Sequence, residues 1–95
     1  MLKYIRRRIV CEVAQFDGTA ASIAPFIESG DAVQNVPADV SAHDVFSDGP
    51  YYIRHSRALV YVGLRIGDWV VREPNGEVYR QVADYFETHW EPADG

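Results

Sequence analysis

The stretch WVVREPNGEVYRQV, residues 69–82, decides the fold, because it holds two strand-like segments joined by a turn. Segments 69–73 and 77–82 are rich in β-branched and aromatic residues, which favour strands. Asn75 and Gly76 lie between them, and both residue types tolerate the positive φ angles of primed hairpin turns. We therefore predict that the two segments pair as an antiparallel hairpin closed at Asn75-Gly76.

A second hairpin is predicted just before this one. Segments 51–55 (YYIRH) and 58–64 (ALVYVGL) have strand composition, with Ser56-Arg57 as the turn. Residues 37–49 show neither helical nor strand periodicity and are dense in Pro, Asp, Ser and Gly, which predicts a long surface loop. A short strand is expected within 33–36.

The two ends of the chain are expected to add further strands. Residues 8–16 (RIVCEVAQF) predict a strand buried on most of both faces, and Asp17-Gly18 ends it with a turn. At the other end, residues 83–87 predict one helical turn, and residues 88–91 predict a last short strand.

One helix is predicted between the first strand and the long loop. Either Thr19 or Ser22 can cap it, and it runs to about Ser29, with Gly30 as its stop. Pro25 falls in the first turn if Ser22 is the cap, whereas it bends the helix if Thr19 is the cap. Three apolar residues have the i, i+3, i+4 spacing of one helix face that packs on a sheet: Ile23, Phe26 and Ile27.

Together these elements predict one α+β domain over residues 1–95. Its helix packs on a mostly antiparallel sheet of five or six strands, which can curl into a partial barrel. We expect one hydrophobic core, which includes Phe16, Ile23, Phe26, Ile27, Val71 and Phe86.

Composition and charge exclude several classes of protein. The apolar fraction of 47% and the charged fraction of 24% are those of an ordinary globular chain. No apolar run approaches the ~20 residues that span a bilayer, so no membrane association is expected. The single Cys11 indicates a reducing compartment. The net charge of −5 argues against direct, sequence-specific nucleic-acid binding, because phosphate binding relies on clustered Lys and Arg.

Self-association is expected from the size of the chain and from its charge distribution. A chain of 95 residues has a thin core, residues 3–8 carry four positive charges, and residues 73–94 carry six acids against one arginine. A two-fold or head-to-tail contact can exploit this polarity, and a homodimer is its simplest form. A solvated acidic face is the alternative interpretation.

Motifs at both ends of the chain point to a known family. YIRRRIVCEVAQFDG at 4–18 has basic residues followed by a strand ending in Gln-aromatic-x-Gly. LRIGDWVVREPNGEVYRQVADYFETHWEP at 64–92 has Gly-Asp-aromatic, a turn, Gly-Glu-x-Tyr and a closing aromatic-Glu-Pro. Together they resemble the PGDYG-type proteins, a family of small phage and prophage proteins, with Ile66, Trp69 and Val70 in place of the family's proline, tyrosine and final glycine. The resemblance implies a phage origin and action in the host cytoplasm, but no particular activity.

No catalytic or metal-binding motif is evident. His43, His55 and His89 are not spaced as metal ligands, and neighbouring residues in a strand point to opposite faces, so His55 is badly placed to act as a base for Ser56. The glycines are spaced as turns and form no phosphate loop. We therefore expect no enzyme activity, no metal and no cofactor.

Arginines interleaved with aromatic residues along consecutive strands are the best binding candidates. Arginine grips phosphate or carboxylate, aromatic rings stack on bases, and both are frequent in protein interfaces. Arg72 and Arg80 flank the 75–76 turn and are expected on one face. The alternative is that the arginines pair with local acids and the aromatics form the core. The predicted ligand- or partner-binding residues are Tyr52, Arg54, Arg57, Trp69, Arg72 and Arg80.

Three functions are compatible with these observations. The first is a phage-encoded, anti-CRISPR-like inhibitor that binds a protein of a host antiviral defence system stoichiometrically. The second is an oligomeric protein that sequesters a small nucleotide immune signal, and the third is a virion or assembly component. We place the inhibitor first, because a small acidic protein without catalytic residues can occupy a basic surface of a host protein.

Overall fold

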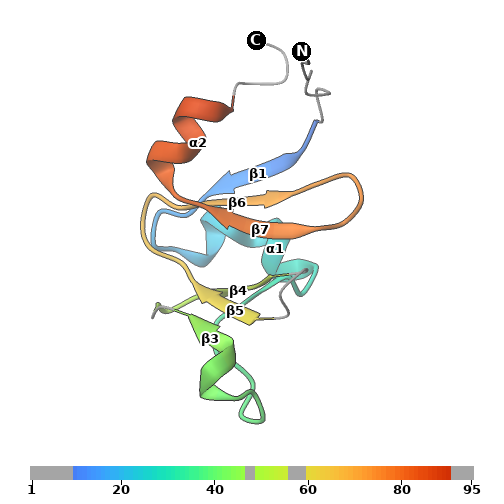
Figure 1. Ribbon diagram of the computed structural model, residues 1–95, viewed down its shortest axis with the longest axis vertical. Helices are drawn as coiled ribbons and strands as arrows, with labels where there is room; N and C mark the ends of the chain where they lie inside the picture. The colour runs from blue at the N-terminus through green and yellow to red at the C-terminus, as the bar shows by residue number, and fades with distance from the viewer. Residues whose placement is uncertain (1–9, 47–48, 56–59, 91–95) are drawn as a thin grey trace, which may run out of the picture.

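The computed structural model describes residues 10–46, 49–55 and 60–90, which form two small sheets and two α-helices (Figure 1). The elements, in chain order, are β1 (Glu12–Gln15), η1 (Ala20–Ile23), α1 (Ala24–Glu28), β2 (Ala32–Val33), η2 (Ala42–Asp44), β3 (Val45–Phe46), β4 (Tyr52–His55), β5 (Val60–Gly63), β6 (Trp69–Arg72), β7 (Val78–Gln81) and α2 (Ala83–His89). The η segments are single 3₁₀ turns.

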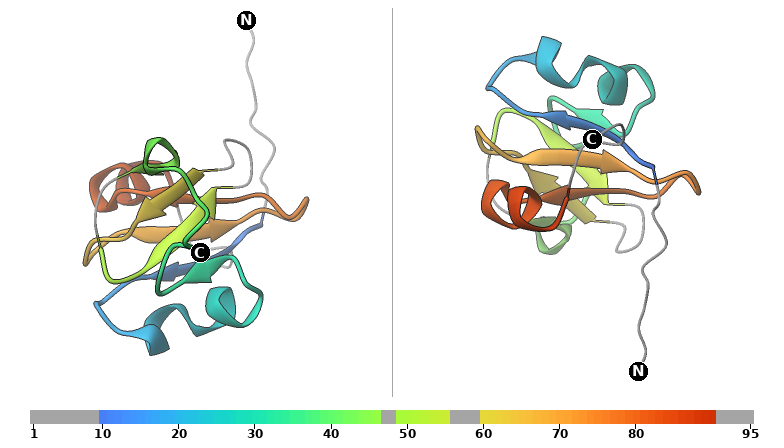
Figure 2. Two further views of the ribbon diagram at one scale, coloured as in Figure 1. Left: turned by 90° about the horizontal axis from the view of Figure 1, so that it is seen from below. Right: turned by 90° about the horizontal axis from the view of Figure 1, so that it is seen from above.

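The α+β class and the mostly antiparallel pairing are confirmed. The strands divide between a three-stranded sheet of order β1-β6-β7 and a four-stranded sheet of order β2-β4-β5-β3, so they do not form a single sheet or a closed barrel. Strand β4 packs beside β7, where the two sheets meet. Views along the long axis show α1 and α2 on opposite sides of the strands (Figure 2).

The hairpin of β6 and β7 is confirmed, with Val71 opposite Tyr79 and Trp69 opposite Gln81. The turn, however, differs from the primed two-residue turn. The Gly76 N–H donates to the Glu73 carbonyl at 2.8 Å, so Pro74 and Asn75 are the central residues of the turn. A proline ring fixes φ near −65°, which rules out a primed turn at Pro74. Gly76, which follows the two central residues, has a positive φ of 93°.

The second hairpin is present as β4 and β5, with His55 opposite Val60, while the predicted turn at Ser56-Arg57 lies outside the described residues. The described residues of 37–49 are exposed or half-buried, as expected of a surface loop, but the prediction that the segment has no helical or strand element is wrong. This segment contains η2 and β3, and Val45 and Phe46 pair in parallel with β5. A two-residue strand has too few residues to show a strand period, and it is stabilised by its pairing with a neighbour far along the chain.

The predicted helix is present in two parts, η1 and α1. Thr19 caps η1 by accepting from the Ser22 N–H at 3.3 Å, and the 3₁₀ turn passes into α1 where Pro25 occupies its first turn. The Thr19 hydroxyl also donates to Asp17 at 2.6 Å, and this bond lowers the pKa of the Asp17 carboxyl. Gly30 follows the helix with a φ of 85°, as expected of a helix stop.

The prediction of a last strand at 88–91 is wrong, because Thr88 and His89 belong to α2 and Trp90 is its C-cap residue. Two ring pairs at i, i+4 spacing, Tyr85 with His89 and Phe86 with Trp90, stack along this helix. Glu91 lies outside the described residues. Neither described α-helix is long and apolar enough to cross a membrane.

The prediction that the first strand is buried on both faces is also wrong. Strand β1 lies at an edge of its sheet, and Glu12, Val13 and Gln15 are exposed. An edge strand has one neighbour instead of two, which leaves its apolar residues partly exposed even where their composition resembles a central strand.

The hydrophobic core lies between the two sheets and under α1. Phe16, Ile23 and Phe26 belong to it as predicted, and Ile27 packs against it. It also contains Ala32, Ile53, Leu64, Val70 and Val78. Val71 is buried but lies on the opposite face of the β1-β6-β7 sheet from Val70, because successive strand residues alternate. Phe86, on α2, is likewise not part of this core, so one core for all six predicted residues is wrong.

Candidate functional site

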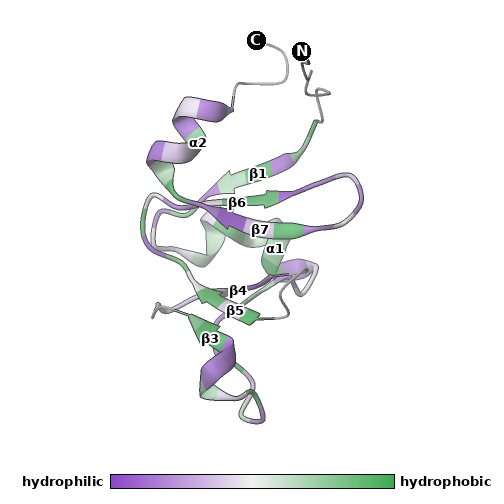
Figure 3. Ribbon diagram, in the orientation of Figure 1, coloured by the Kyte–Doolittle hydropathy of each residue, from purple (hydrophilic) through white to green (hydrophobic). Residues whose placement is uncertain are grey.

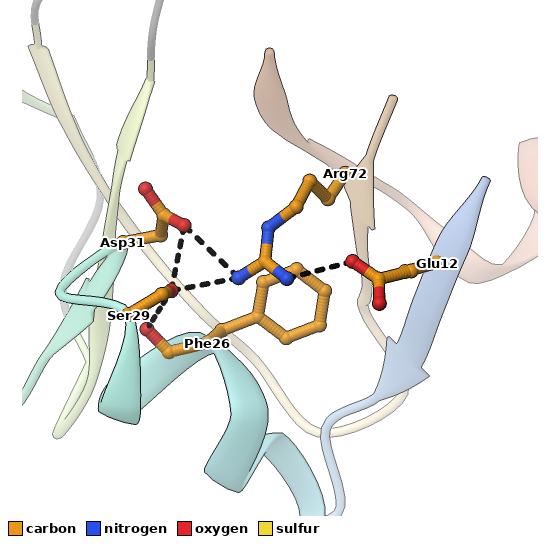
Figure 4. Close-up of polar contacts among 5 residues, drawn as sticks. All are labelled: Glu12, Phe26, Ser29, Asp31 and Arg72. Atoms are coloured by element: carbon orange, nitrogen blue, oxygen red, sulfur yellow. Dashed lines mark hydrogen bonds and ion pairs between the residues drawn. The ribbon is translucent and has the colours of Figure 1, made fainter. Parts of the chain in front are cut away.

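Arg72 is the most connected of the predicted binding residues (Figure 4). Its guanidinium donates to Glu12 at 2.7 Å, to the Ser29 hydroxyl at 2.7 Å and to Asp31 at 3.0 Å. The guanidinium carbon lies 4.7 Å from the centre of the Phe26 ring, in a cation–π arrangement. We call these five residues the Arg72 network. It joins β1, β6, α1 and the turn after α1, which is a structural function.

Electrostatics within the network agree with this interpretation. The hydrogen bond to Glu12, followed by the interactions with Asp31, raises the pKa of Arg72. The Arg72 side chain is only 22% exposed, whereas that of Glu12 is 71% exposed. A guanidinium has five N–H donors, and three protein acceptors already surround this one. Arg72 therefore has little capacity left for an external phosphate or carboxylate.

Arg80 has a similar internal function. It lies on the same face of the hairpin as Arg72, as expected, but it donates to the Gly63 carbonyl at 3.2 Å and lies 3.6 Å from a carboxylate oxygen of Asp68. Asp68 is buried, and its side chain also accepts from the Arg65 N–H at 2.9 Å. Arg80 thus ties β7 to the end of β5, and it does not combine with Arg72 into one anion-binding fork.

The remaining predicted residues are not brought together with Arg72 and Arg80. Arg54 is exposed on β4, and its backbone N–H donates to the Asp31 carbonyl. Tyr52 is half-buried on the same strand, opposite Gly63. Arg57 lies outside the described residues. Within the described part of the chain, the arginines and aromatics of the prediction therefore do not form one continuous binding patch.

Trp69, the last predicted residue, belongs to a different arrangement on the outer face of the β1-β6-β7 sheet. Its ring stacks on Phe86 at 4.0 Å between ring centres, and Phe86 stacks on Trp90 at 5.1 Å, with 7° between the planes in both pairs. Tyr85 stacks on His89 at 4.0 Å and 17°. The two stacks share only helix α2, and we call their five residues together the aromatic platform. Stacked pairs of this kind contribute roughly 0.5–1.5 kcal/mol beyond the area they bury.

The aromatic platform combines a buried stack, Trp69 on Phe86, with an exposed ring, Tyr85. The Trp69 Nε1–H is buried and has no acceptor among the described residues, which marks the Trp69–Phe86 contact as closed to water. Tyr85 is 50% exposed, and the acids Asp84 and Glu87 beside it are exposed. Figure 3 shows mainly hydrophilic residues along α2. The helix thus presents a half-exposed aromatic ring in an acidic, polar surface.

Sequence reasoning missed Tyr85, Phe86, His89 and Trp90 as a group. The signal was available, because residues 85 and 89 have the i, i+4 spacing of one helix face, and residues 86 and 90 have the same spacing on the neighbouring face. Assigning 88–91 to a strand placed these rings on different elements and concealed the pattern.

The reactive side chains of the outer face are held in unreactive forms. Tyr79 donates its hydroxyl to Glu73 at 2.7 Å, and burial followed by this bond raises the pKa of Tyr79 well above its usual range. Burial, together with the charge of Glu73, raises the pKa of the Cys11 thiol. A thiol with a raised pKa is a poor nucleophile at neutral pH. Among residues 10–46, 49–55 and 60–90, no three His, Cys, Asp or Glu side chains gather as a metal site.

Comparison with known proteins adds no relative, because no protein-family model, curated protein or solved structure matches the chain.

Proposed function

We propose that this chain is a small, non-enzymatic binding protein of phage origin that inhibits a host antiviral defence system in the host cytoplasm. It acts by occupying a host protein stoichiometrically, and the aromatic platform is the surface that docks. The observation that carries this proposal is Tyr85, a ring that is 50% exposed and already fixed by stacking on His89.

A pre-positioned aromatic ring suits a protein interface. Tyrosine supplies a large contact area at a small entropic cost, and it is one of the residues that dominate interface hot spots. Stacking on His89 further reduces the freedom that Tyr85 would lose on binding. The exposed carboxylates of Asp84 and Glu87 favour a partner with basic groups around an apolar pocket.

The state of the arginines favours a protein partner over a nucleotide. A nucleotide site needs arginines whose donors are free for phosphate, but Arg72 and Arg80 are bonded to Glu12, Asp31 and Asp68. Releasing them would break contacts that join β1, β6, α1, β5 and β7. The aromatic platform requires no such rearrangement.

Plating of phage on defended bacteria tests the proposal directly. The protein is expressed in strains that each carry one antiviral defence system, and each strain is infected with a phage that the system normally blocks. We expect wild-type protein to restore plaque formation on one such strain. When the purified target is titrated with this protein, its remaining activity should fall linearly and level off near one molecule of inhibitor per target site. An unchanged efficiency of plating on every strain would contradict the inhibitor function, and inhibition at far lower ratios would contradict a stoichiometric mechanism.

A pair of matched variants tests the docking surface. Tyr85→Ala should weaken binding to the identified target by more than ~2 kcal/mol, about 30-fold in Kd, as loss of a hot spot does. Phe46→Ala is the control, since Phe46 is 54% exposed but lies on β3, at the opposite end of the molecule from α2 (Figure 1). Cys11→Ser should leave activity within a few-fold. Equal binding by the Tyr85 and Phe46 variants, measured by titration calorimetry, would show that the platform does not dock.

A further inference from the structure

Arg54 lies on the face of the four-stranded sheet that is turned away from the core. On the opposite face, Ile53 of β4 belongs to the core, and its cross-strand partner Val62 of β5 packs against it. Because strand residues alternate between the two faces, Arg54, Tyr52 and the cross-strand partner Tyr61 point outward. The left view of Figure 2 looks onto this outer side of β4 and β5.

The Arg54 guanidinium has no partner within the described part of the chain. The side chain is exposed, and no described acid or carbonyl bonds to it. The backbone N–H of Arg54 donates to the Asp31 carbonyl at 2.9 Å, but the Asp31 carboxylate is already bonded to Ser29 and Arg72. In contrast to Arg72, Arg54 therefore keeps its N–H donors for an acceptor outside the chain.

Two tyrosines border Arg54 on the same face. Tyr61 is directly opposite Arg54, so their Cβ atoms are about 4.5–5.5 Å apart. Tyr52 is two residues from Arg54 on β4, which is about 7 Å along the strand. Both tyrosines are half-buried, so their rings are supported by neighbours and still present part of their surface. Arginine and tyrosine are among the residues that dominate protein interfaces, and here they lie side by side on a rigid sheet.

The charge of this sheet is opposite in sign to that of the whole chain. The net charge of the chain is −5, but β2, β3, β4 and β5 contain no Asp or Glu, and Arg54 is their only Arg or Lys. One guanidinium forms a two-bond fork with one carboxylate. A nucleotide with several phosphates carries more negative charge than one arginine balances, and the acidic chain repels the excess. Charge complementarity therefore favours a single carboxylate as the group that Arg54 binds.

We propose that this outer face binds a partner protein through a segment that carries one carboxylate between apolar residues. The carboxylate pairs with Arg54, and the apolar side chains beside it pack on Tyr52 and Tyr61. Val33, opposite Tyr52, and Val45, opposite Tyr61, continue the apolar border on the two sides. The strands β4 and β5 lie away from α2, so the two surfaces are separate (Figure 1). This inference is independent of the proposed inhibitor function.

Selection from a library of random peptides displayed on yeast tests the proposal. Peptides that bind wild-type protein are kept, and those that also bind Arg54→Ala are discarded, which removes peptides for other surfaces. We expect the remaining peptides to share an Asp or Glu beside apolar residues. Arg54→Ala should weaken such a peptide at least about tenfold. Arg65→Ala is the matched control and should bind within about twofold, because Arg65 is also exposed and its side chain has no described partner, but it lies between β5 and β6.

Further measurements separate the fork from charge alone and test other occupants of the face. Arg54→Lys keeps the charge but not the fork, so it should recover only part of the lost affinity. All variants should share the circular dichroism spectrum of wild-type protein, since both arginines are exposed. The proposal would be overturned if no peptide survived the selection, if the survivors lacked an acid, or if Arg54→Ala and Arg65→Ala bound equally. Displacement of the peptide by adenosine triphosphate at a lower concentration than by N-acetylglutamate would assign the face to a nucleotide instead. Wild-type oligomers in sedimentation that Arg54→Ala dissociates would assign it to a second copy of the chain.

Discussion

The two faces of the β1-β6-β7 sheet use the same kinds of residue in opposite ways. On the core face, Arg72 lies over Phe26 and bonds to three acceptors, so a residue typical of binding sites holds the fold together. On the outer face, Trp69 and Phe86 stack tightly, but Tyr85 beside them remains half exposed. Residue type alone therefore does not separate a binding surface from a structural one; the number of partners already present in the chain does.

Phe26→Ala should give the largest loss of stability, because it removes a ring that is 2% exposed and lies beneath Arg72. We expect the free energy of unfolding to fall by ~3–5 kcal/mol, from lost burial and from the cavity that remains. Urea denaturation measures it, with Phe46→Ala as an exposed control that should change stability by less than about 0.5 kcal/mol. A loss below about 1 kcal/mol for Phe26→Ala would show that α1 is not packed as described.

Arg72→Ala should give a smaller loss, about 1–2 kcal/mol, since the ion pairs of Arg72 are partly exposed and each is weak. Arg72→Met keeps an unbranched side chain over Phe26 and should lose less than Arg72→Ala. Arg54→Ala is the control, because Arg54 is exposed on β4 and should have no measurable effect on urea stability. If Arg72→Ala were as harmless as Arg54→Ala, the Arg72 network would not be structural, and its donors would be candidates for a ligand after all.

Local signals in the sequence were sufficient for the parts of the fold that local chemistry controls. The turn at 74–76 was sufficient to predict the β6–β7 hairpin. The i, i+3, i+4 spacing of apolar residues, followed by Gly30, was sufficient to predict α1. The division into two sheets and the parallel pairing of β3 with β5 could not be predicted, because both depend on contacts between distant segments. The edge position of β1 was missed for the same reason.

The candidate site was predictable only in part. Sequence singled out Trp69 and Arg72, but the partners that decide their functions are distant: Phe86 for Trp69, and Ser29 and Asp31 for Arg72. The i, i+4 spacing of Tyr85 and His89 was a signal for their stacking, but the exposure of the Tyr85 ring could not be predicted from the sequence, because it depends on how α2 lies on the sheet.

Tyr79→Phe probes a contact of the outer face that is closed within the chain, as the Arg72 network is on the core face. The Tyr79 hydroxyl donates to Glu73 at 2.7 Å, and its loss should lower stability by about 1 kcal/mol near neutral pH. Burial and Glu73 raise the pKa of Tyr79 above its ordinary value of 10.0. The folded protein therefore holds this proton at pH values where the unfolded chain releases it.

The advantage of wild-type over Tyr79→Phe should consequently depend on pH in one direction. Below pH 10 both states of the wild-type chain keep the phenol proton, so the stabilisation by the Tyr79–Glu73 bond is fully present. As the pH rises above 10, only the unfolded state loses the proton, and the wild-type free energy of unfolding falls. The phenylalanine variant lacks this group, while every other titrating residue is common to both proteins. Urea denaturation at about pH 8 and about pH 11 should show the gap shrinking, and a gap that stays constant would mean that Tyr79 is as open to water as Tyr85.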